Sequence, residues 1–367
     1  MSAATELART DGSHEITARL ARFFDERTVQ AAAYGSAFER LWRLAGEAAT
    51  GGKLVRPLLL LDVYDALASP RPGSGIADRE TALDVAAAVE LLHFSFLLHD
   101  DVIDQDTVRR GRPNLIGALM DQARESGSAS DALAGTVHWA RTGAILMGDL
   151  LLAACHREIA RADVPRTRRV ELLDLLDRTV SESVAGELID VGLSHGLVPP
   201  RLATVLGMTT HKTATYTFEL PLRAGAILAG ADGATQDVLG AVGRHLGLGF
   251  QLQDDLLSTF GDPARHGKGR YSDLREGKQT ALVAMARTTT SWPGIEPRLG
   301  RPGLTDRDAE WLAGELEACG ARTAVEGLVR RELTAAVDLV DDPANGLTGS
   351  LRAVLHELTR TLRGRSA

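Results

Sequence analysis

The feature that most constrains the fold of this chain is an apolar stretch, Val89 to Ile103, that is interrupted near its end by aspartates. Its only earlier charge is Glu90, and it closes as His99-Asp100-Asp101-Val102-Ile103-Asp104. Burying carboxylates beside so much apolar surface is costly unless a cation compensates them. On a helix, Asp100 and Asp104 stand at i and i+4 and project from one face, so they can share a metal cluster. The stretch therefore predicts a long helix that ends in a cation-binding cluster.

The rest of the chain also predicts helices. Its 367 residues are 44% hydrophobic, which allows a large core, and aromatic residues make up only 4%. The period-2 alternation of strands is not sustained, and no repeat of fixed period is found. No linker is long enough to separate two cores. We predict an all-α single domain over residues 1–367, with a flexible N-terminus at 1–20 and a flexible insertion at 121–136.

Breakers and helical spacing divide the chain into segments. A helix is expected to begin at 53–57, where a proline lies near its first turn. A loop with two prolines and two glycines is expected at 69–75. A second acidic pair, Asp254-Asp255, closes a second apolar helix in the same way as the first. The expected helices are 23–49, 58–68, 80–105, 137–162, 166–193, 202–229, 234–260 and 274–289, followed by a linker at 291–305 and further helices interrupted at 341–349.

Charge and cysteine content exclude several classes of function. The net charge is −8 and no block of lysine and arginine stands out, which argues against a nucleic-acid partner. Cys155 and Cys319 each stand alone, as fits a reducing cytoplasm without a disulfide framework or zinc site. The polar N-terminus lacks a signal-peptide core, and no run approaches the roughly 18 uncharged apolar residues of a membrane span. We expect a cytoplasmic protein without a transmembrane segment.

The two acidic clusters suit Mg²⁺, which prefers oxygen ligands and commonly bridges carboxylates to phosphate oxygens. Carboxylates alone would repel a phosphate, so basic groups are needed beside them. Taken singly, an Asp-Asp pair is more typical of a solvated helix end, and His93 or Phe96 of a core. Together, and each at a helix boundary, these features favour binding of magnesium with a phosphate group. The basic candidates are Lys53, Arg56, Arg109, Arg110, Lys212, Lys268 and Lys278.

Through these motifs the chain resembles the trans-isoprenyl diphosphate synthases, over about Lys53 to Thr280. The stretches 257–263 and 273–278 are most similar to those of bacterial geranylgeranyl diphosphate synthases. In chain order the motifs are Gly51-Gly52-Lys53-x-x-Arg56-Pro57, Glu90-Leu91-Leu92-His93, Asp100-Asp101-x-x-Asp104, Arg109-Arg110-Gly111-x-Pro113, Lys212-Thr213-Ala214, Phe250-Gln251-x-x-Asp254-Asp255, Gly261-Asp262 and Asp273-Leu274-x-x-Gly277-Lys278-x-Thr280.

The resemblance implies an isoprenoid synthase bundle of about ten or more helices around a central cavity, with the two aspartate motifs facing each other across its mouth. It also implies a homodimer and three Mg²⁺ ions. The implied metal ligands are Asp100, Asp101, Asp104, Asp254 and Asp255. The implied allylic diphosphate site is Arg109, Lys212, Thr213, Gln251, Lys268 and Lys278. The implied isopentenyl diphosphate site is Lys53, Arg56, His93 and Arg110. The implied catalytic set is Asp100, Asp101, Asp104, Arg109, Lys212 and Asp254.

The reaction that the resemblance implies needs no covalent enzyme intermediate. Metals and cations stabilise the charge on the departing pyrophosphate, and the double bond of isopentenyl diphosphate attacks the allylic carbocation. Product length would depend on what lies beneath the first motif. Phe96, one turn before Asp100, would block a growing tail, whereas Ser95 leaves room. We expect a short-chain product, geranylgeranyl diphosphate (C20) first and farnesyl diphosphate (C15) next.

The second motif departs from the family's usual Asp-Asp-x-x-Asp because its fifth position is Ser258. Asp262 lies about two turns beyond Asp254, where Gly261 and Pro263 indicate that the helix is ending. Two rival functions remain, a noncatalytic subunit of a prenyl synthase complex, which generally loses motif aspartates, and a class I terpene cyclase. The cyclase usually carries an Asn-Ser-Glu second motif and has no site for isopentenyl diphosphate. The Asp-Asp, Gly-Gly-Lys and Arg-Arg elements favour the active synthase over both.

Overall fold

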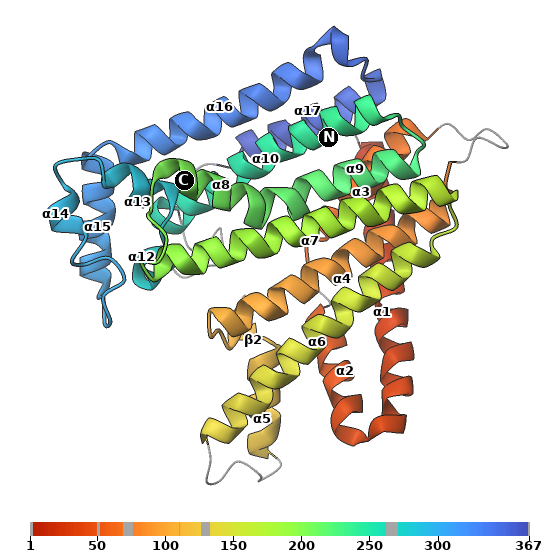
Figure 1. Cartoon of the computed structure of the whole chain (residues 1–367), viewed down its shortest axis with the longest axis horizontal. Coiled ribbons are helices and arrows are strands. Elements are labelled where there is room, and N and C mark those ends of the chain that lie inside the picture. The colour runs from red at the N-terminus through yellow and green to blue at the C-terminus, as the bar shows by residue number, and fades with distance from the viewer. Residues whose placement is uncertain are drawn as a thin grey trace. The chain divides into compact units, whose positions relative to one another are not determined.

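The structure is a computed structural model that describes residues 3–49, 52–68, 76–109, 111–125, 133–261 and 271–365, with the backbone alone for 3–10 and 133 (Figure 1). Nearly every described element is a helix, so the all-α prediction is confirmed. The chain divides into two compact units. Unit 1 extends to Leu173 and includes Leu228–Gly230, and unit 2 comprises Asp174–Ile227 and the chain from Ala231 onward. The prediction of a single domain stays a prediction.

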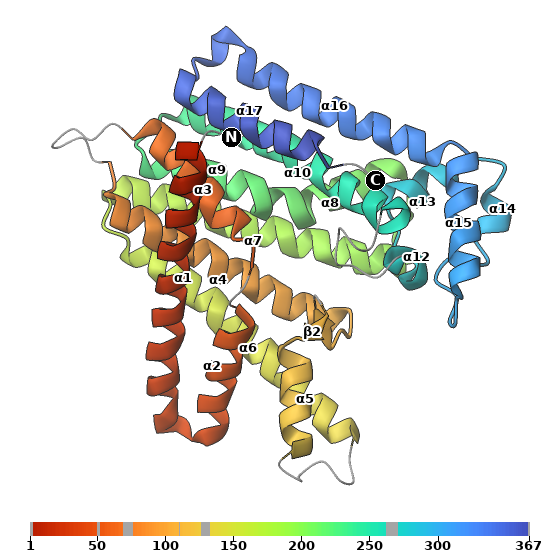
Figure 2. The ribbon, with the colours of Figure 1, turned by 180° about the vertical axis from the view of Figure 1, so that it is seen from behind.

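Unit 1 is built around α4 (Arg79–Ile103). This helix packs along α6 and against α1 and α3, and Figures 1 and 2 both show it beside α6. Asp78 caps its N-terminus by accepting a hydrogen bond from the Thr81 N–H at 2.7 Å. The other elements are α1 (Ala3–Ala31), η1 (Ala32–Tyr34), α2 (Ser36–Ala49), α3 (Val55–Leu67), β1 (Val108–Arg109), β2 (Arg112–Pro113), α5 (Leu115–Glu125), α6 (Leu133–Arg161) and the first part of α7 (Arg166–Ser194).

The expectation that no segment reaches the length and apolarity of a membrane span is corrected for α4. By length and composition this helix could cross a membrane, with a mean hydropathy of 1.6 in its most apolar window. However, 78% of that window is buried inside the structure. Because the core helix of a globular protein passes the same test, this burial identifies α4 as a core helix.

The two expectations of flexibility, at 1–20 and 121–136, stay predictions, and the described residues of both segments are helical. The segment 1–20 is helical from Ala3 onward, because Ile16 and Leu20 bury their side chains and Arg19 Nε donates to Asp84 Oδ1 at 2.8 Å. The segment 121–136 is helical at both ends, since α5 continues to Glu125 and α6 begins at Leu133. Its centre, 126–132, lies outside the described residues.

Unit 2 is built around α10 (Gly233–Phe260), which confirms the helix expected at 234–260. α16 runs along α10 in Figures 1 and 2, and η2 packs against it. The other elements are the second part of α7, α8 (Leu202–Thr209), the π-helix η2 (Thr210–Glu219), α9 (Leu220–Leu228) up to Ile227, α12 (Ser272–Glu276), α13 (Ala281–Ala286), α14 (Trp292–Ile295), α15 (Asp306–Ala318), α16 (Ala321–Asp341), η3 (Pro343–Asn345) and α17 (Gly349–Arg363).

Two helices predicted in this unit are broken. The segment 202–229 runs as α8, η2 and α9, so its centre is a π-helix. The segment 274–289 is interrupted after α12, because Gly277 has a left-handed backbone with φ of 71° and Thr280 starts α13 as its N-cap. The interruption expected at 341–349 is confirmed, because α16 ends at Asp341 and α17 begins at Gly349.

Glycines allow η2 to lie unusually close to its neighbours. A Cβ atom on Gly247 of α10 would lie 2.5 Å from the Ala214 Cα, and one on Gly186 of α7 would lie 2.3 Å from the Lys212 backbone nitrogen. Both distances are far shorter than van der Waals contact. The backbone of η2 is therefore held against α7 and α10 by contacts that only glycine permits at these two positions.

Candidate active site

The first aspartate motif lies at the C-terminal end of α4. Asp104 is the residue at which the helix ends, and its N–H still donates to the Asp100 carbonyl at 2.8 Å. Asp100 is half-buried, with 27% of its side chain exposed, and Asp104 is exposed. The two carboxylates therefore lie one turn apart on the same side of the helix end, as their spacing predicts.

Asp101 is turned to Arg109. The Nε and Nη2 atoms of Arg109 donate to Asp101 Oδ1 at 2.9 and 2.6 Å, and Nη2 also donates to Asp100 Oδ2 at 3.1 Å. Only 3% of the Asp101 side chain is exposed. Burial raises the pKa of Asp101 to about 6, although the Arg109 guanidinium acts in the opposite direction. In this arrangement Asp101 positions Arg109, and its predicted role as a metal ligand stays a prediction.

A short hairpin returns Arg109 to the end of α4. β1 and β2 pair antiparallel, with Arg109 opposite Arg112. Asn114 then caps α5, since its Oδ1 accepts from the Gly117 N–H at 3.0 Å. A Cβ atom on Gly117 would lie 2.3 Å from the Thr107 carbonyl oxygen, so glycine is needed for α5 to approach the hairpin this closely. The hairpin thus fixes the backbone from which Arg109 reaches both aspartates.

Behind the first motif, α4 meets α6 at Gly148. His99 Nε2 lies 3.2 Å from Asp149 Oδ1, and a Cβ atom on Gly148 would lie 2.4 Å from His99 Nε2. Ser95 is fully buried and donates its hydroxyl to the Gly148 carbonyl at 2.8 Å. Ser95 therefore serves the packing of the two helices, while Phe96 is half-buried one turn before the motif. Their predicted roles in chain length stay predictions.

The predicted isopentenyl diphosphate residues that the structure describes all belong to unit 1. Lys53 is exposed just before α3, where Leu54 has a left-handed backbone with φ of 48°. Arg56 is half-buried in the first turn of α3, and His93 is half-buried on α4, against which α3 packs. Arg110 lies outside the described residues.

In unit 2, Lys212 lies on the π-helix η2 and contacts two acids of α7. Its Nζ donates to Asp190 Oδ2 at 2.6 Å and lies 2.9 Å from Glu187 Oε2. The neighbouring Thr213 is half-buried. Sequence reasoning missed Glu187 and Asp190, and the available signal was weak, because two acids three residues apart are common on helices. A π-helical turn between α-helices is frequently found at functional sites.

The second aspartate motif lies at the C-terminal end of α10, where a residue near the end of the chain reaches it. Arg365 Nη2 donates to Asp254 Oδ1 at 2.5 Å, and its guanidinium lies 4.3 Å from the centre of the Phe250 ring. Gln253 Nε2 donates to the Leu362 carbonyl at 2.9 Å, which anchors α17 to α10. Arg365 is outside the stretch that resembles known motifs, so no motif indicates this contact.

The remaining predicted residues of unit 2 have local partners. Asp255 is buried, and Gln251 Nε2 donates to its Oδ1 at 3.0 Å from one turn earlier. Lys278 is half-buried and its Nζ lies 3.0 Å from Glu276 Oε2. Lys268 lies outside the described residues.

The residues present fit magnesium bound together with a phosphate group. In the part of the chain that the structure describes, no group of three or more His, Cys, Asp or Glu side chains converges on a potential metal position. Mg²⁺ in phosphate-binding sites commonly takes only one or two carboxylates and keeps waters and phosphate oxygens as its other ligands. Asp100 and Asp104 can supply such a pair on unit 1, and Asp254, with 25% of its side chain exposed, can supply a ligand on unit 2.

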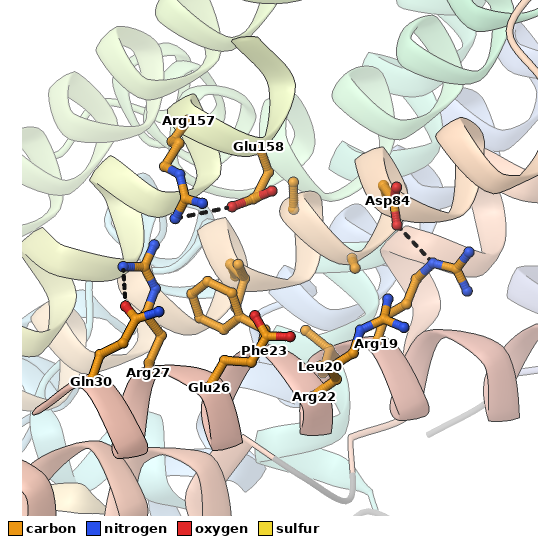
Figure 3. A pocket seen from close by; sticks show the side chains of 13 residues that line it. Arg19, Leu20, Arg22, Phe23, Glu26, Arg27, Gln30, Asp84, Arg157 and Glu158 are labelled. Carbon is orange, nitrogen blue, oxygen red and sulfur yellow. Dashed lines mark hydrogen bonds and ion pairs between the residues drawn. The ribbon is translucent and has the colours of Figure 1, made fainter. Parts of the chain in front are cut away.

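A pocket elsewhere in unit 1 is not the candidate site. It is lined by side chains of α1, α4 and α6 (Figure 3), and none of the predicted site residues contributes to it. Two ion pairs lie within it, Arg19 with Asp84 at 2.8 Å and Arg157 with Glu158 at 3.6 Å. The aspartates of the two motifs are not among its lining residues.

Comparisons with known proteins show which proteins this chain is similar to. Residues 40–294 match the family model of polyprenyl synthetase. The (2E,6E)-farnesyl diphosphate synthase of Mycobacterium tuberculosis is 30% identical over 297 residues, covering 79% of this chain and 73% of that protein. The geranylgeranyl diphosphate synthase of Methanosarcina mazei is 30% identical over 279 residues, covering 76% of each.

Solved structures show the same fold. The crystal structure of geranylgeranyl pyrophosphate synthase from Corynebacterium glutamicum, complexed with isoprenyl diphosphate and magnesium, has a TM-score of 0.85 at 27% identity. The match covers 96% of this chain and 98% of that one. The predicted isoprenoid synthase fold is therefore confirmed.

Proposed function

We propose that this chain, which belongs to the polyprenyl synthetase family and is a short-chain trans-prenyltransferase, condenses isopentenyl diphosphate with an allylic diphosphate to form geranylgeranyl diphosphate (C20). The observation that carries the proposal is the end of α4. There Asp100 and Asp104 lie one turn apart, and Arg109 is held beside them by Asp101. Carboxylates for a metal and a guanidinium for a phosphate thus come together in one place.

These residues have distinct roles in the proposed reaction. Bound Mg²⁺ would supply positive charge for the diphosphate of the allylic substrate and for the pyrophosphate that leaves. Arg109 can donate hydrogen bonds to phosphate oxygens, because Asp101 fixes its guanidinium from one side. Lys212, held by Asp190, offers a compact charge for the same group. The described residues proposed to bind isopentenyl diphosphate are Lys53, Arg56 and His93.

Support for the metal and substrates comes from the Corynebacterium glutamicum enzyme, whose structure holds isoprenyl diphosphate and magnesium. We propose three Mg²⁺ ions for this chain, a homodimer and a cytoplasmic location, as the family resemblance and the cysteine content suggest. A noncatalytic subunit and a terpene cyclase are disfavoured, because the two relatives described above are prenyl diphosphate synthases.

A farnesyl (C15) product is the second candidate. The Mycobacterium tuberculosis relative, a farnesyl diphosphate synthase, is as similar in sequence as the geranylgeranyl enzyme of Methanosarcina mazei. We favour C20 because the Corynebacterium glutamicum geranylgeranyl enzyme covers nearly the whole chain. Chromatography of the products made from C5, C10 and C15 starters separates the two candidates, since a farnesyl synthase does not extend the C15 starter.

Asp100→Ala tests the proposed chemistry. Removal of this carboxylate should lower turnover about 100-fold or more, because the charge on the departing pyrophosphate loses part of its stabilisation. The helical circular dichroism signal should be unchanged, since Asp100 is half-buried at a helix end. Asp163→Asn, at an exposed position between α6 and α7, is the matched control and should keep wild-type turnover. Absence of any condensation product from the wild-type protein with Mg²⁺ and both substrates would refute the proposal.

A further inference from the structure

The ends of α4 and α10 differ at one position. On α4, the carboxylates of Asp100 and Asp104 stand one turn apart, whereas on α10 Asp254 is followed one turn later by Ser258. A serine hydroxyl is a weak ligand for Mg²⁺ compared with a carboxylate. Besides Asp255, α10 therefore has no carboxylate one turn after Asp254 to match Asp104 at the end of α4.

A carboxylate from another element reaches this position. Asp273 of α12 places its Oδ2 atom 2.5 Å from the Ser258 hydroxyl, and the Tyr271 N–H donates to the Ser258 carbonyl at 3.0 Å. The same hydroxyl lies 2.9 Å from the Asp255 carbonyl. A hydroxyl has a single proton, and the shorter contact takes it, so Ser258 donates to the Asp273 carboxylate. This hydrogen bond fixes the direction of one Asp273 oxygen.

Asp273 is buried, and none of the described cations pairs with it. It is only 8% exposed, and its other hydrogen bond comes from the Ser272 hydroxyl at 3.4 Å. Within residues 3–49, 52–68, 76–109, 111–125, 133–261 and 271–365, no lysine, arginine or histidine forms an ion pair with it. A buried carboxylate that has only hydroxyl partners is costly, and a bound cation would relieve that cost. Asp254, one turn before Ser258, already attracts a cation in the form of Arg365.

We propose that Asp273 supplies the second carboxylate of the metal-binding end of α10, where it acts with Asp254 and is oriented by Ser258. The inference rests on the proposed function, because it names a further residue of that same magnesium diphosphate site. Serine at position 258 suits this arrangement, since a carboxylate there would lie against Asp273 and the two like charges would repel in the absence of metal.

Binding of Mn²⁺ in the presence of inorganic pyrophosphate, followed by electron paramagnetic resonance, tests this assignment without a turnover measurement. Asp273→Asn should weaken the Mn²⁺ affinity about tenfold, in the range found when groups that support metal sites are removed. Ser258→Asp introduced into the Asp273→Asn protein should restore most of that affinity, because it returns a carboxylate to the same place. Asp338→Asn, at an exposed position on α16, is the matched control and should bind Mn²⁺ like the wild type.

Each result decides the assignment. Wild-type Mn²⁺ affinity in Asp273→Asn, combined with weakened affinity in Asp254→Asn, would overturn the role of Asp273 and leave the proposed function intact. Failure of Ser258→Asp to restore affinity would show that Asp273 has a structural role only. No Mn²⁺ binding by the wild type with pyrophosphate would overturn both. If Asp273→Asn does not fold, Ser258→Ala takes its place, because it retains the Asp273 carboxylate and removes the hydroxyl that orients it. This variant should weaken Mn²⁺ binding several-fold. Wild-type affinity in Ser258→Ala would refute the assignment.

Discussion

The close contact between α7 and η2 can be tested with Gly186→Ala. The added Cβ would lie 2.3 Å from the Lys212 nitrogen and 2.7 Å from its Cα. Non-bonded atoms prefer about 3.5 Å or more, so one of the two backbones must move by about 1 Å. Both neighbouring atoms are backbone, and rotation of a flexible side chain cannot relieve the contact. The substitution thus displaces the segment that carries Lys212.

The expected effect on stability is smaller than the effect on activity. Overpacking costs about 1–3 kcal/mol, and replacing glycine with alanine in a helix returns about 1 kcal/mol. The free energy of unfolding should therefore fall by about 0–2 kcal/mol. A misplacement of about 1 Å in a positioning group can lower a rate about 100-fold. Because the shift acts at Lys212, we expect turnover to fall about 10- to 100-fold while the KM for isopentenyl diphosphate changes little.

Two measurements check this prediction, urea unfolding followed by circular dichroism and steady-state release of pyrophosphate. Gly314→Ala is the matched control, since Gly314 lies inside α15 and a Cβ there meets nothing within 4 Å. The control should gain up to about 1 kcal/mol in stability and keep its activity. If Gly186→Ala shows the same gain and the same turnover as Gly314→Ala, the contact does not position Lys212 and the reasoning is refuted.

Two further substitutions probe the ends of α10 and α4. Arg365→Ala should raise the affinity for Mn²⁺ in the absence of pyrophosphate about two- to fivefold. In the wild type the metal must break the partly exposed Arg365–Asp254 ion pair, which contributes about 0.5–1 kcal/mol. Calorimetric titration measures this, with exposed Arg363→Ala as its control, and equal affinities in both variants would contradict it. Phe96→Ala should lengthen the main product by at least one five-carbon unit, because the ring one turn before Asp100 is removed, and chromatography of the products checks this. An unchanged product would show that Phe96 does not limit the chain.

The sequence predicts well what depends on neighbours within one helix. Asp100 and Asp104 share one side of α4 because their spacing is a property of the helix itself. The orientation of Asp101 cannot be predicted in this way. It depends on Arg109, which lies eight residues later in the chain and is brought back to Asp101 by the hairpin. Nothing in the residues between them specifies that return until the β1–β2 pairing is known.

Long-range contacts account for most of what the sequence does not indicate. Lys212 is recognisable by its motif, but its π-helical backbone depends on glycines of α7 and α10, and its partner Asp190 lies 22 residues earlier. Asp273 belongs to a recognisable motif, yet its contact with Ser258 depends on how α12 docks on α10. The sequence does not indicate that α1 begins as early as Ala3 for a related reason, because apolar positions such as Ile16 become meaningful only when α4 is there to cover them.

The two cations proposed for the allylic diphosphate share one design. Arg109 and Lys212 are each held by acids, the first by Asp101 on α4 and the second by Asp190 on α7. These two side chains are therefore already ordered in the folded protein. Ordering such a side chain costs about 1.5–2 kcal/mol in lost rotamer freedom, and substrate binding does not have to supply that free energy. The acids also lower the net positive charge of each site, and a diphosphate alone would meet less attraction there. Such a site favours a diphosphate that arrives with its metal, because the metal is attracted by the same carboxylates that hold the cations in place.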